Sequence, residues 1–296
     1  MDLTPIFKTA NPVIGVVHLL PLPASPRWQG DLQAVIARAE QEATALAAGG
    51  AHGLIVENFF DAPFPKSRVD PAVVSAMSLI VHRLKQLVTL PIGLNVLRND
   101  ARSALAIATC TGASFIRVNV LTGVMATDQG LIEGEAHDIL RYRRELGADV
   151  KIFADVLVKH AHPLGSPNLA TVVQEVVQDT IHRGLADGVI LSGAATGIPP
   201  SPEDLIAARQ AAGDTPIFIG SGASIDNIAQ LVGAADGVIV SSSLKRKGQI
   251  EQCIDPIRVR DFVTALSLAV AARAEMPKAG RPEPMTTNSA RSMALS

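Results

Sequence analysis

The chain has 296 residues, 48% of them hydrophobic, which is enough to bury a large core. Its 26 basic and 28 acidic side chains leave a formal net charge of −2, which excludes long-range attraction to nucleic acid or to an anionic membrane. The two cysteines, Cys110 and Cys253, form no CxxC pair, and no apolar run approaches the roughly 18 residues of a membrane span. We expect a cytoplasmic protein with no disulfide framework, no signal peptide, no membrane span and no nucleic-acid partner.

Eight short apolar runs, rich in β-branched residues, follow one another along the chain. They are continuous rather than alternating, which is typical of strands buried on both faces of a parallel sheet. We therefore predict a strand at each run. The predicted strands cover residues 13–17, 53–56, 91–96, 115–118, 151–156, 188–191, 216–219 and 237–240.

Amphipathic segments separate the predicted strands. In the first of these segments, apolar residues recur three and four positions apart, as on one face of a helix: Leu32, Val35, Ile36, Ala39, Ala43 and Leu46. A second segment repeats the pattern at Leu169, Val172, Val173, Val176, Val177 and Ile181. Helix starts are indicated by capping side chains, three of which precede a proline. The candidate caps are Asp31, Asp70, Asp100, Ser166, Ser201, Ser224 and Asp255. Cys110 lies on an apolar helical stretch and is expected in the core, whereas His52 is expected at the solvated surface.

The alternation of strands and helices predicts right-handed crossovers and a parallel sheet. Eight such units favour closure into a single (β/α)₈ TIM barrel over residues 1–275. An open doubly wound α/β sheet is the alternative, but the first strand runs into His18 and Leu19 rather than into a GxGxxG turn. Residues 276–296 are rich in Pro, Ser, Thr and Ala without a period, so we expect a flexible tail.

Polar residues follow the first five predicted strands, at the end of the barrel where such folds build active sites. The candidate catalytic residues are His18, Glu57, Asn95, Arg117, Asn119, Asp155 and Lys159. Charged side chains beside apolar strand ends are costly unless they meet partners or water, so we expect one polar cluster. As a general acid–base set, His18, Glu57 and Asp155 would converge in one pocket, with at least one shifted pKa. One of them would move protons, and Lys159 or Arg117 would hold charge. A purely structural polar network is the alternative.

A metal site is a third interpretation of the same end of the barrel. His18, Glu57, Asp155 and His160 offer nitrogen and oxygen ligands from different strands. No compact motif such as HExxH is present, and we predict no cofactor; a divalent metal is the minor alternative.

The last three predicted strands end in small residues instead. Glycine and serine allow backbone N–H groups to approach an anion, and a following helix would add a favourable dipole. The candidate phosphate-binding residues are Ser192, Gly193, Gly220, Ser221, Gly222, Ala223, Ser241 and Ser242. The alternative is that these residues only form tight turns. On the phosphate interpretation, Gly222→Val should block the anion while leaving the fold intact.

Several of these segments, in the same order along the chain, resemble the BtpA family. The resemblance spans about residues 10–270 and is carried by 13–23 (VIGVVHLLPLP), 55–59 (IVENF), 93–100 (GLNVLRND), 115–119 (FIRVN), 153–156 (FADV), 192–197 (SGAATG), 220–222 (GSG) and 235–237 (ADG). It implies a barrel of the ribulose-phosphate-binding type. The family is named for a photosystem I assembly factor, and some members are described as phosphoribosylanthranilate isomerase. That isomerase uses a cysteine at the first strand and an aspartate at the fifth, where this chain has His18 and Asp155.

Two functions therefore remain open from the sequence. The first is an enzyme that acts on a phosphorylated sugar or nucleotide-like metabolite by isomerase or lyase chemistry, and a homo-oligomer is compatible with it. The second is a non-catalytic biogenesis or assembly factor, as for photosystem I, on a barrel scaffold. The number of polar side chains at the strand ends favours the enzyme.

Overall fold

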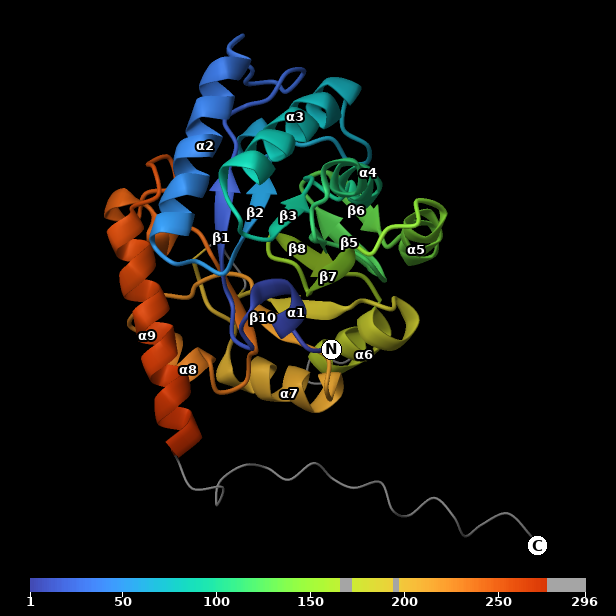
Figure 1. Ribbon diagram of the computed structural model, residues 1–296. Coiled ribbons are helices and arrows are strands. Elements are labelled where there is room, and N and C mark those ends of the chain that lie inside the picture. Colours follow the sequence, from blue (N-terminus) through green and yellow to red (C-terminus); the bar gives the residue numbers. More distant parts are fainter. Residues whose placement is uncertain (166–171, 194–196, 276–296) are drawn as a thin grey trace, which may run out of the picture.

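The computed structural model describes residues 1–165, 172–193 and 197–275, and within them eight parallel strands close into a barrel (Figure 1). The order around the barrel is β1-β11-β10-β9-β7-β4-β3-β2. The strands are β1 (Val13–His18), β2 (Gly53–Glu57), β3 (Ile92–Asn95), β4 (Phe115–Val118), β7 (Lys151–Val156), β9 (Gly188–Leu191), β10 (Ile217–Ile219) and β11 (Gly237–Val240). All eight predicted strands are confirmed, and the closed order excludes the doubly wound alternative.

Each barrel strand is followed by a helix that packs outside it. The helices are α2 (Leu32–Ala48), α3 (Pro71–Leu87), α4 (Ala101–Thr111), α5 (Ala136–Glu145), α6 (Val172–Gln178), α7 (Pro202–Ala212), α8 (Ile228–Leu231) and α9 (Pro256–Glu275). A π-helical turn, Asp179–Arg183, continues α6. Among the described residues, no helix has the length and apolar character needed to cross a membrane.

Most of the predicted helix caps are confirmed. The side chains of Asp31, Asp70, Asp100, Ser201 and Asp255 each accept a hydrogen bond from a backbone N–H in the first helical turn. Ser224 was expected to cap a helix and does not. The helix after β10 begins only at Ile228 and has four residues, with Asn227 before it. Ser166 and the tail 276–296 lie outside the described residues.

The apolar residues of the barrel strands divide between two clusters, as alternation of side chains along a strand requires. One cluster lies between the strands and the helices. The other fills the barrel and consists of Ile14, Val16, Ile55, Phe115, Phe153, Ile190, Phe218 and Ile239, joined by Leu3 and Phe7. The short helix α1 (Thr4–Phe7) lies at the end from which the strands start (Figure 1). It closes that end, because the Phe7 ring lies 5.5 Å from that of Phe115. The interior is a packed core whose other end is free to carry a site.

A small antiparallel sheet was not predicted from the sequence. It pairs β6 (Gly130–Glu133), β5 (Val124–Thr127) and β8 (Ala161–Pro163), and these strands lie in the connections that follow β4 and β7. It covers a minor apolar cluster of Val120, Met125, Ile132 and Val158. Strands of three and four residues, partly polar and without a long apolar run, give little periodic signal.

Two single-residue expectations were wrong. Cys110 is exposed, because the buried face of α4 is formed by Ala101, Ala104, Leu105, Ile107 and Ala108. Cys110 follows Ala108 by two positions, which places it about 200° away around the helix. His52 is partly buried, and its Nδ1 accepts a hydrogen bond of 3.1 Å from the backbone N–H of Val13.

Candidate active site

The strands build a polar layer directly above the apolar interior of the barrel. Because side chains alternate along a strand, the residue two positions after each inward-facing residue also faces inward. Val16, Ile55, Phe115 and Phe153 therefore place polar side chains above the core. The complete layer, one residue from each barrel strand or from the position that follows it, is His18, Glu57, Asn95, Arg117, Asp155, Ser192, Gly220 and Ser241. All eight were among the residues singled out from the sequence.

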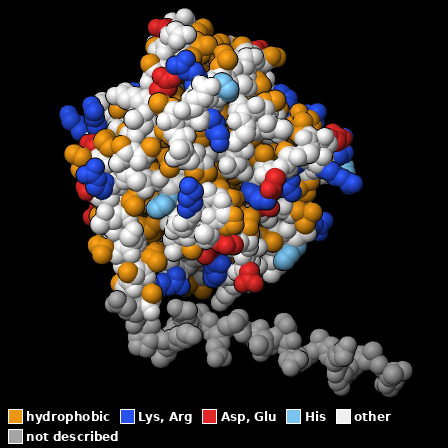
Figure 2. Space-filling model, viewed as in Figure 1, with side chains coloured by type: hydrophobic (Ala, Val, Ile, Leu, Met, Phe, Trp, Pro, Cys, Tyr) orange, Lys and Arg blue, Asp and Glu red, His pale blue; other side chains and the backbone are white. Residues whose placement is uncertain are grey.

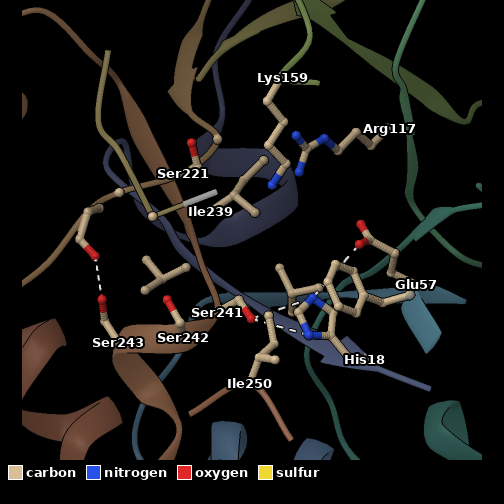
Figure 3. Close-up of a pocket in the computed structure, with 17 residues that line it drawn as sticks. His18, Glu57, Arg117, Lys159, Ser221, Ile239, Ser241, Ser242, Ser243 and Ile250 are labelled. Carbon is tan, nitrogen blue, oxygen red and sulfur yellow. Dashed lines mark hydrogen bonds and ion pairs between the residues drawn. The ribbon is translucent and has the colours of Figure 1, made fainter. Parts of the chain in front are cut away.

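A pocket lies above this layer, at the C-terminal end of the barrel (Figure 3). Its empty space, the open mouth included, amounts to about 520 Å³. Of the predicted site residues, the pocket is lined by His18, Glu57, Arg117, Lys159, Gly220, Ser221, Gly222, Ala223, Ser241 and Ser242. Asn95, Asn119, Asp155, Ser192 and Gly193 are not part of its lining. Asp155 therefore lies behind the pocket rather than in it.

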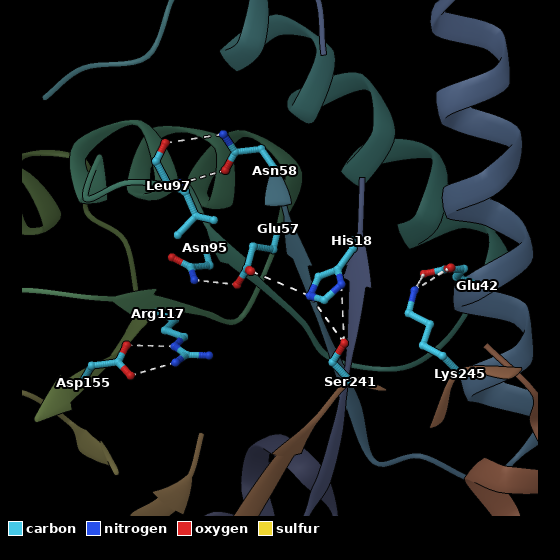
Figure 4. A network of polar contacts seen from close by, with 10 residues as sticks. All are labelled: His18, Glu42, Glu57, Asn58, Asn95, Leu97, Arg117, Asp155, Ser241 and Lys245. Carbon is cyan, nitrogen blue, oxygen red and sulfur yellow. Dashed lines mark hydrogen bonds and ion pairs between the residues drawn. The ribbon is translucent and has the colours of Figure 1, made fainter. Parts of the chain in front are cut away.

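His18 and Glu57 come from adjacent strands and face each other in register. The His18 Nε2 atom lies 3.8 Å from Glu57 Oε1, and Asn95 Nδ2 donates a hydrogen bond of 2.6 Å to Glu57 Oε2 (Figure 4). The His18 ring stacks on that of Phe59, with centroids 4.3 Å apart. Burial, followed by the positive charges of Lys245, Lys159 and Arg117, lowers the pKa of His18 well below its ordinary value of 6.5. His18 is therefore a neutral imidazole at pH 7.

Arg117 and Asp155 form a buried ion pair beside this histidine–glutamate pair. Arg117 Nε donates to Asp155 Oδ2 at 2.8 Å, and Nη2 donates to Oδ1 at 2.7 Å (Figure 4). Asn119 Nδ2 donates a third hydrogen bond to Asp155. Burial by itself would lower the pKa of Arg117, but the charge and hydrogen bonds of Asp155 outweigh it and raise that pKa. Both carboxylate oxygens of Asp155 are therefore engaged in holding and neutralising the Arg117 guanidinium.

Lys159 reaches the pocket from the loop after β7. No carboxylate of the described residues lies within ion-pair distance of its ammonium group, although Glu57 and Asp155 attract it from further away. Burial, and then the charge of Arg117, lowers the pKa of Lys159. Arg98, itself buried, donates a hydrogen bond of 3.0 Å to the Lys159 carbonyl and so fixes the loop that carries it.

The opposite wall of the pocket is formed by the loops after β10 and β11. Ser243 Oγ donates to the Ala223 carbonyl at 2.7 Å and joins the two loops (Figure 3). The backbone N–H groups of Gly222 and Ala223 form no hydrogen bond with any described residue. Two donors beside a pocket are suited to an anion. The expected helix dipole is missing here, because α8 is a single turn that starts at Ile228.

Gly193 and Gly222 are required by the packing of these loops against each other. A Cβ at Gly222 would lie 2.1 Å from the backbone nitrogen of Pro199, and its φ of +76° disfavours any other residue. A Cβ at Gly193 would lie 2.4 Å from the Ile198 carbonyl. The expectation that Gly222→Val leaves the fold intact was therefore wrong, since the valine would displace the backbone of the loop after β9.

Some pocket residues were missed from the sequence. Phe59, Gly197, Ser243 and Ile250 line the pocket, and Arg98 supports it from behind. The pair Phe59-Phe60, directly after a strand-end glutamate in a chain with 3% aromatic residues, was a signal for an aromatic wall. No sequence signal pointed to Ile250, because it lies nine residues beyond Ser241 in an irregular loop. Among the described residues no three His, Cys, Asp or Glu side chains gather in a way that could hold a metal ion.

A second buried ion pair lies next to the pocket. Lys245 Nζ donates to both carboxylate oxygens of Glu42, at 2.7 and 2.8 Å, and both side chains are fully buried (Figure 4). Arg38 Nε also donates to Glu42, at 2.8 Å. This cluster ties the loop after β11 to helix α2.

Comparison with known proteins agrees with this architecture. A phosphoribosylanthranilate isomerase from Pyrococcus furiosus superposes with a TM-score of 0.53 at 15% identity, over 87% of this chain and 99% of that one. An orotidine 5′-phosphate decarboxylase from Pyrococcus horikoshii gives a TM-score of 0.52 at 17% identity, over 86% and 99%. At these identities the similarity demonstrates the fold alone.

Sequence relatives are much closer. The chain is 72% identical over 267 residues to the photosystem I biogenesis protein BtpA of Synechocystis, covering 90% of this chain and 92% of that one. It is 43% identical over 253 residues to an uncharacterised protein of Thermococcus kodakarensis (86% and 94%) and 32% identical over 266 residues to an uncharacterised mitochondrial protein of Caenorhabditis elegans (87% and 94%). The model of the BtpA family matches residues 9–267. The chain is therefore a member of the BtpA family.

Proposed function

We propose that this protein is an enzyme that moves a proton on a phosphorylated sugar or nucleotide-like metabolite, in an isomerase or lyase reaction. The observation that carries the proposal is the composition of one pocket. A histidine–carboxylate pair and two cations line it together with backbone amides, from the loops after β10 and β11, that form no hydrogen bond with the described residues.

In this proposal His18 and Glu57 are the proton-transfer residues. Glu57, oriented by Asn95, accepts the proton, and the neutral imidazole of His18 beside it donates its N–H to the substrate. General acid–base catalysis needs such groups within hydrogen-bond reach of the reacting atoms. The phosphate group would bind the amides of Gly222, Ala223 and Ser242, and thereby hold the reacting carbon near His18.

Binding of inorganic phosphate tests the anion site directly. Ser242 lies at the pocket wall, and its side chain makes no hydrogen bond with any described residue. Ser242→Asp would place a negative charge in the anion site, whereas Ser242→Asn has the same shape without the charge. We expect calorimetry to give millimolar or tighter phosphate binding for the native chain and the asparagine variant, and a loss of at least about tenfold for the aspartate variant. A native chain that binds no phosphate would overturn the proposal.

A second candidate function is a biogenesis factor, and one observation favours it. The relative with 72% identity is named for photosystem I biogenesis. The family nevertheless includes proteins of an archaeon and of a nematode, organisms without photosystem I, so this role does not account for the whole family. Turnover of a phosphorylated compound by the native chain, and its loss in Glu57→Gln, would favour the enzyme. Phosphate binding with no turnover across sugar and nucleotide phosphates would favour the second candidate.

A further inference from the structure

Arg117 keeps one nitrogen free for a ligand. Its Nε and Nη2 atoms are occupied by Asp155, whereas Nη1 forms no hydrogen bond with any described residue. Figure 4 shows this third nitrogen directed away from Asp155. Because Arg117 also lines the pocket, its ion pair with Asp155 fixes a guanidinium group whose remaining N–H donors face a ligand.

Lys159 provides a second cation beside Arg117. Figure 3 shows the ends of the two side chains converging at the pocket wall. Burial lowers the pKa of Lys159 most, and the positive charge of Arg117 lowers it further. Two cations that repel each other in a partly buried site are stabilised by an anion between them.

The charges behind this wall do not balance within the described residues. The buried end of the barrel brings together three cations, Arg98, Arg117 and Lys159, against two carboxylates, Glu57 and Asp155. Exposed Asp128 offsets Arg98 only from a distance, and His18 is neutral. An excess positive charge in a buried site is costly unless an anion accompanies it.

Two polar atoms close to Arg117 also have no partner among the described residues. The side-chain oxygens of Asn119 and Ser192 are buried and form no hydrogen bond within that part of the chain. Asn119 is 4% exposed and contacts Asp155 through its other side-chain atom. Ser192 lies beside Gly220, at which a Cβ would be 2.6 Å from Ser192 Oγ and 3.3 Å from Arg117 Nη2. Buried polar atoms are rarely left unpaired in a native protein, so these two, which lie behind the pocket lining, are suited to ordered water between them and the wall.

We propose that the substrate of this pocket carries a carboxylate as well as a phosphate, and that Arg117 Nη1 and Lys159 Nζ bind the carboxylate. This inference rests on the proposed function, since the phosphate is assigned to the loops after β10 and β11. The two cations and the amides assigned to the phosphate line the same pocket as His18 and Glu57. The substrate class is therefore a phosphorylated sugar acid or a related phosphorylated acid, with its reacting atoms beside the histidine.

Matched pairs of compounds test this assignment. Each pair has the same carbon number and phosphate but differs in carrying a carboxylate or an alcohol: 3-phosphoglycerate with glycerol 3-phosphate, 4-phosphoerythronate with erythritol 4-phosphate, and 6-phosphogluconate with sorbitol 6-phosphate. Calorimetry at constant ionic strength gives each Kd. We expect at least one acid to bind about tenfold or more tightly than its alcohol, as charge-assisted hydrogen bonds provide.

Lys159→Met should remove that preference while changing the Kd of inorganic phosphate less than threefold. Lys151→Met is the matched control. Lys151 begins β7 at the other end of the barrel and pairs with Asp149, so its loss should leave the preference intact. This control separates a local carboxylate site from general electrostatic attraction.

The outcomes separate this inference from the proposed function. Equal binding of acid and alcohol in every pair, with phosphate bound, would overturn the carboxylate site and leave the proposed function standing. An acid preference that survives Lys159→Met would also overturn the assignment. If neither phosphate nor any phosphorylated compound binds, the proposed function fails and the inference fails with it.

Discussion

At the scale of single residues, the two carboxylates of the polar layer have different tasks. Glu57 lines the pocket, and one of its oxygens lies 3.8 Å from His18. Asp155 is absent from the lining, and both its oxygens accept hydrogen bonds from Arg117. In the proposed reaction Glu57 would therefore transfer the proton, whereas Asp155 holds a cation in place.

Glu57→Gln should therefore lower turnover by about 10²–10⁴-fold with little change in stability. Glutamine has the same shape, and its carbonyl oxygen still accepts the hydrogen bond from Asn95. Steady-state kinetics on the substrate, together with urea unfolding, provides the measurement. A variant that retains full turnover would remove Glu57 from the mechanism.

Asp155→Asn, in contrast to Glu57→Gln, should lower the stability of the protein. It leaves the buried guanidinium of Arg117 without its counter-charge, and breaking one side of a buried pair costs about 3–5 kcal/mol of unfolding free energy. Urea unfolding should detect this loss directly. Wild-type stability in Asp155→Asn would contradict the support role and restore Asp155 as a candidate acid or base.

At the scale of elements, the loop between β11 and α9 is held from outside the barrel. This loop carries Ser241, Ser242 and Ser243, and its only fully buried charge, Lys245, is bound by Glu42 of α2. A bridge between Lys245 and Ile254 closes the loop on itself. The pocket wall thus depends on a contact with a helix that comes more than 200 residues earlier.

Lys245→Met should destabilise the protein by about 3 kcal/mol, because Glu42 keeps only its bond to Arg38. We also expect weaker phosphate binding, since the loop loses its attachment to α2. The double variant Glu42→Leu with Lys245→Met replaces the pair by apolar contacts and should recover most of the stability. Urea unfolding and phosphate calorimetry on all three chains test this. A double variant as unstable as the single one would contradict the account.

At the scale of the whole molecule, the apolar core and the polar pocket lie at different ends of the barrel axis. The aromatic interior and α1 close one end, and the polar layer with its pocket occupies the other. The cost of burying polar groups is concentrated at the second end, where neutral His18 lies under Phe59. The pH dependence of global stability should therefore report on this end.

His18 has a pKa below its unfolded value of 6.5, so between these two values the unfolded chain binds more protons than the folded one. Stability should consequently fall as pH decreases below 6.5, by up to about 1.4 kcal/mol per pH unit from this group. His18→Gln should reduce the slope of unfolding free energy between pH 5 and 6.5. The pKa values of His52 and His160 are also lowered, and both residues are present in the native chain and in the variant. The difference in slope between the two proteins therefore reports on His18. Identical slopes would show that His18 does not titrate on unfolding.

Much of the fold and part of the site followed from local patterns. The eight strands were predicted because their apolar runs are continuous, and five of the helix caps because a capping side chain acts within its own turn. All members of the polar layer were among the predicted residues, since each lies in the C-terminal half of an apolar strand or directly after it. The small sheet was not predicted, and the expectations for Cys110 and for a helix capped by Ser224 were wrong. Each of these features depends on packing that a local run of residues does not encode.

The sequence by itself determined eight buried strands alternating with helices and polar residues at the strand ends, because periodicity and chain order impose both, and it favoured closure into a barrel. The tertiary structure established that closure. The tertiary structure alone decided which charges meet. Arg117 and Asp155 are 38 residues apart and Lys245 and Glu42 are 203 apart, so their pairing depends on strand register and side-chain direction. It likewise decided that Gly193 and Gly222 serve the packing of loops, since that requirement comes from the backbone of a neighbouring loop. Interactions of a few ångströms between distant segments arise only once the barrel has closed.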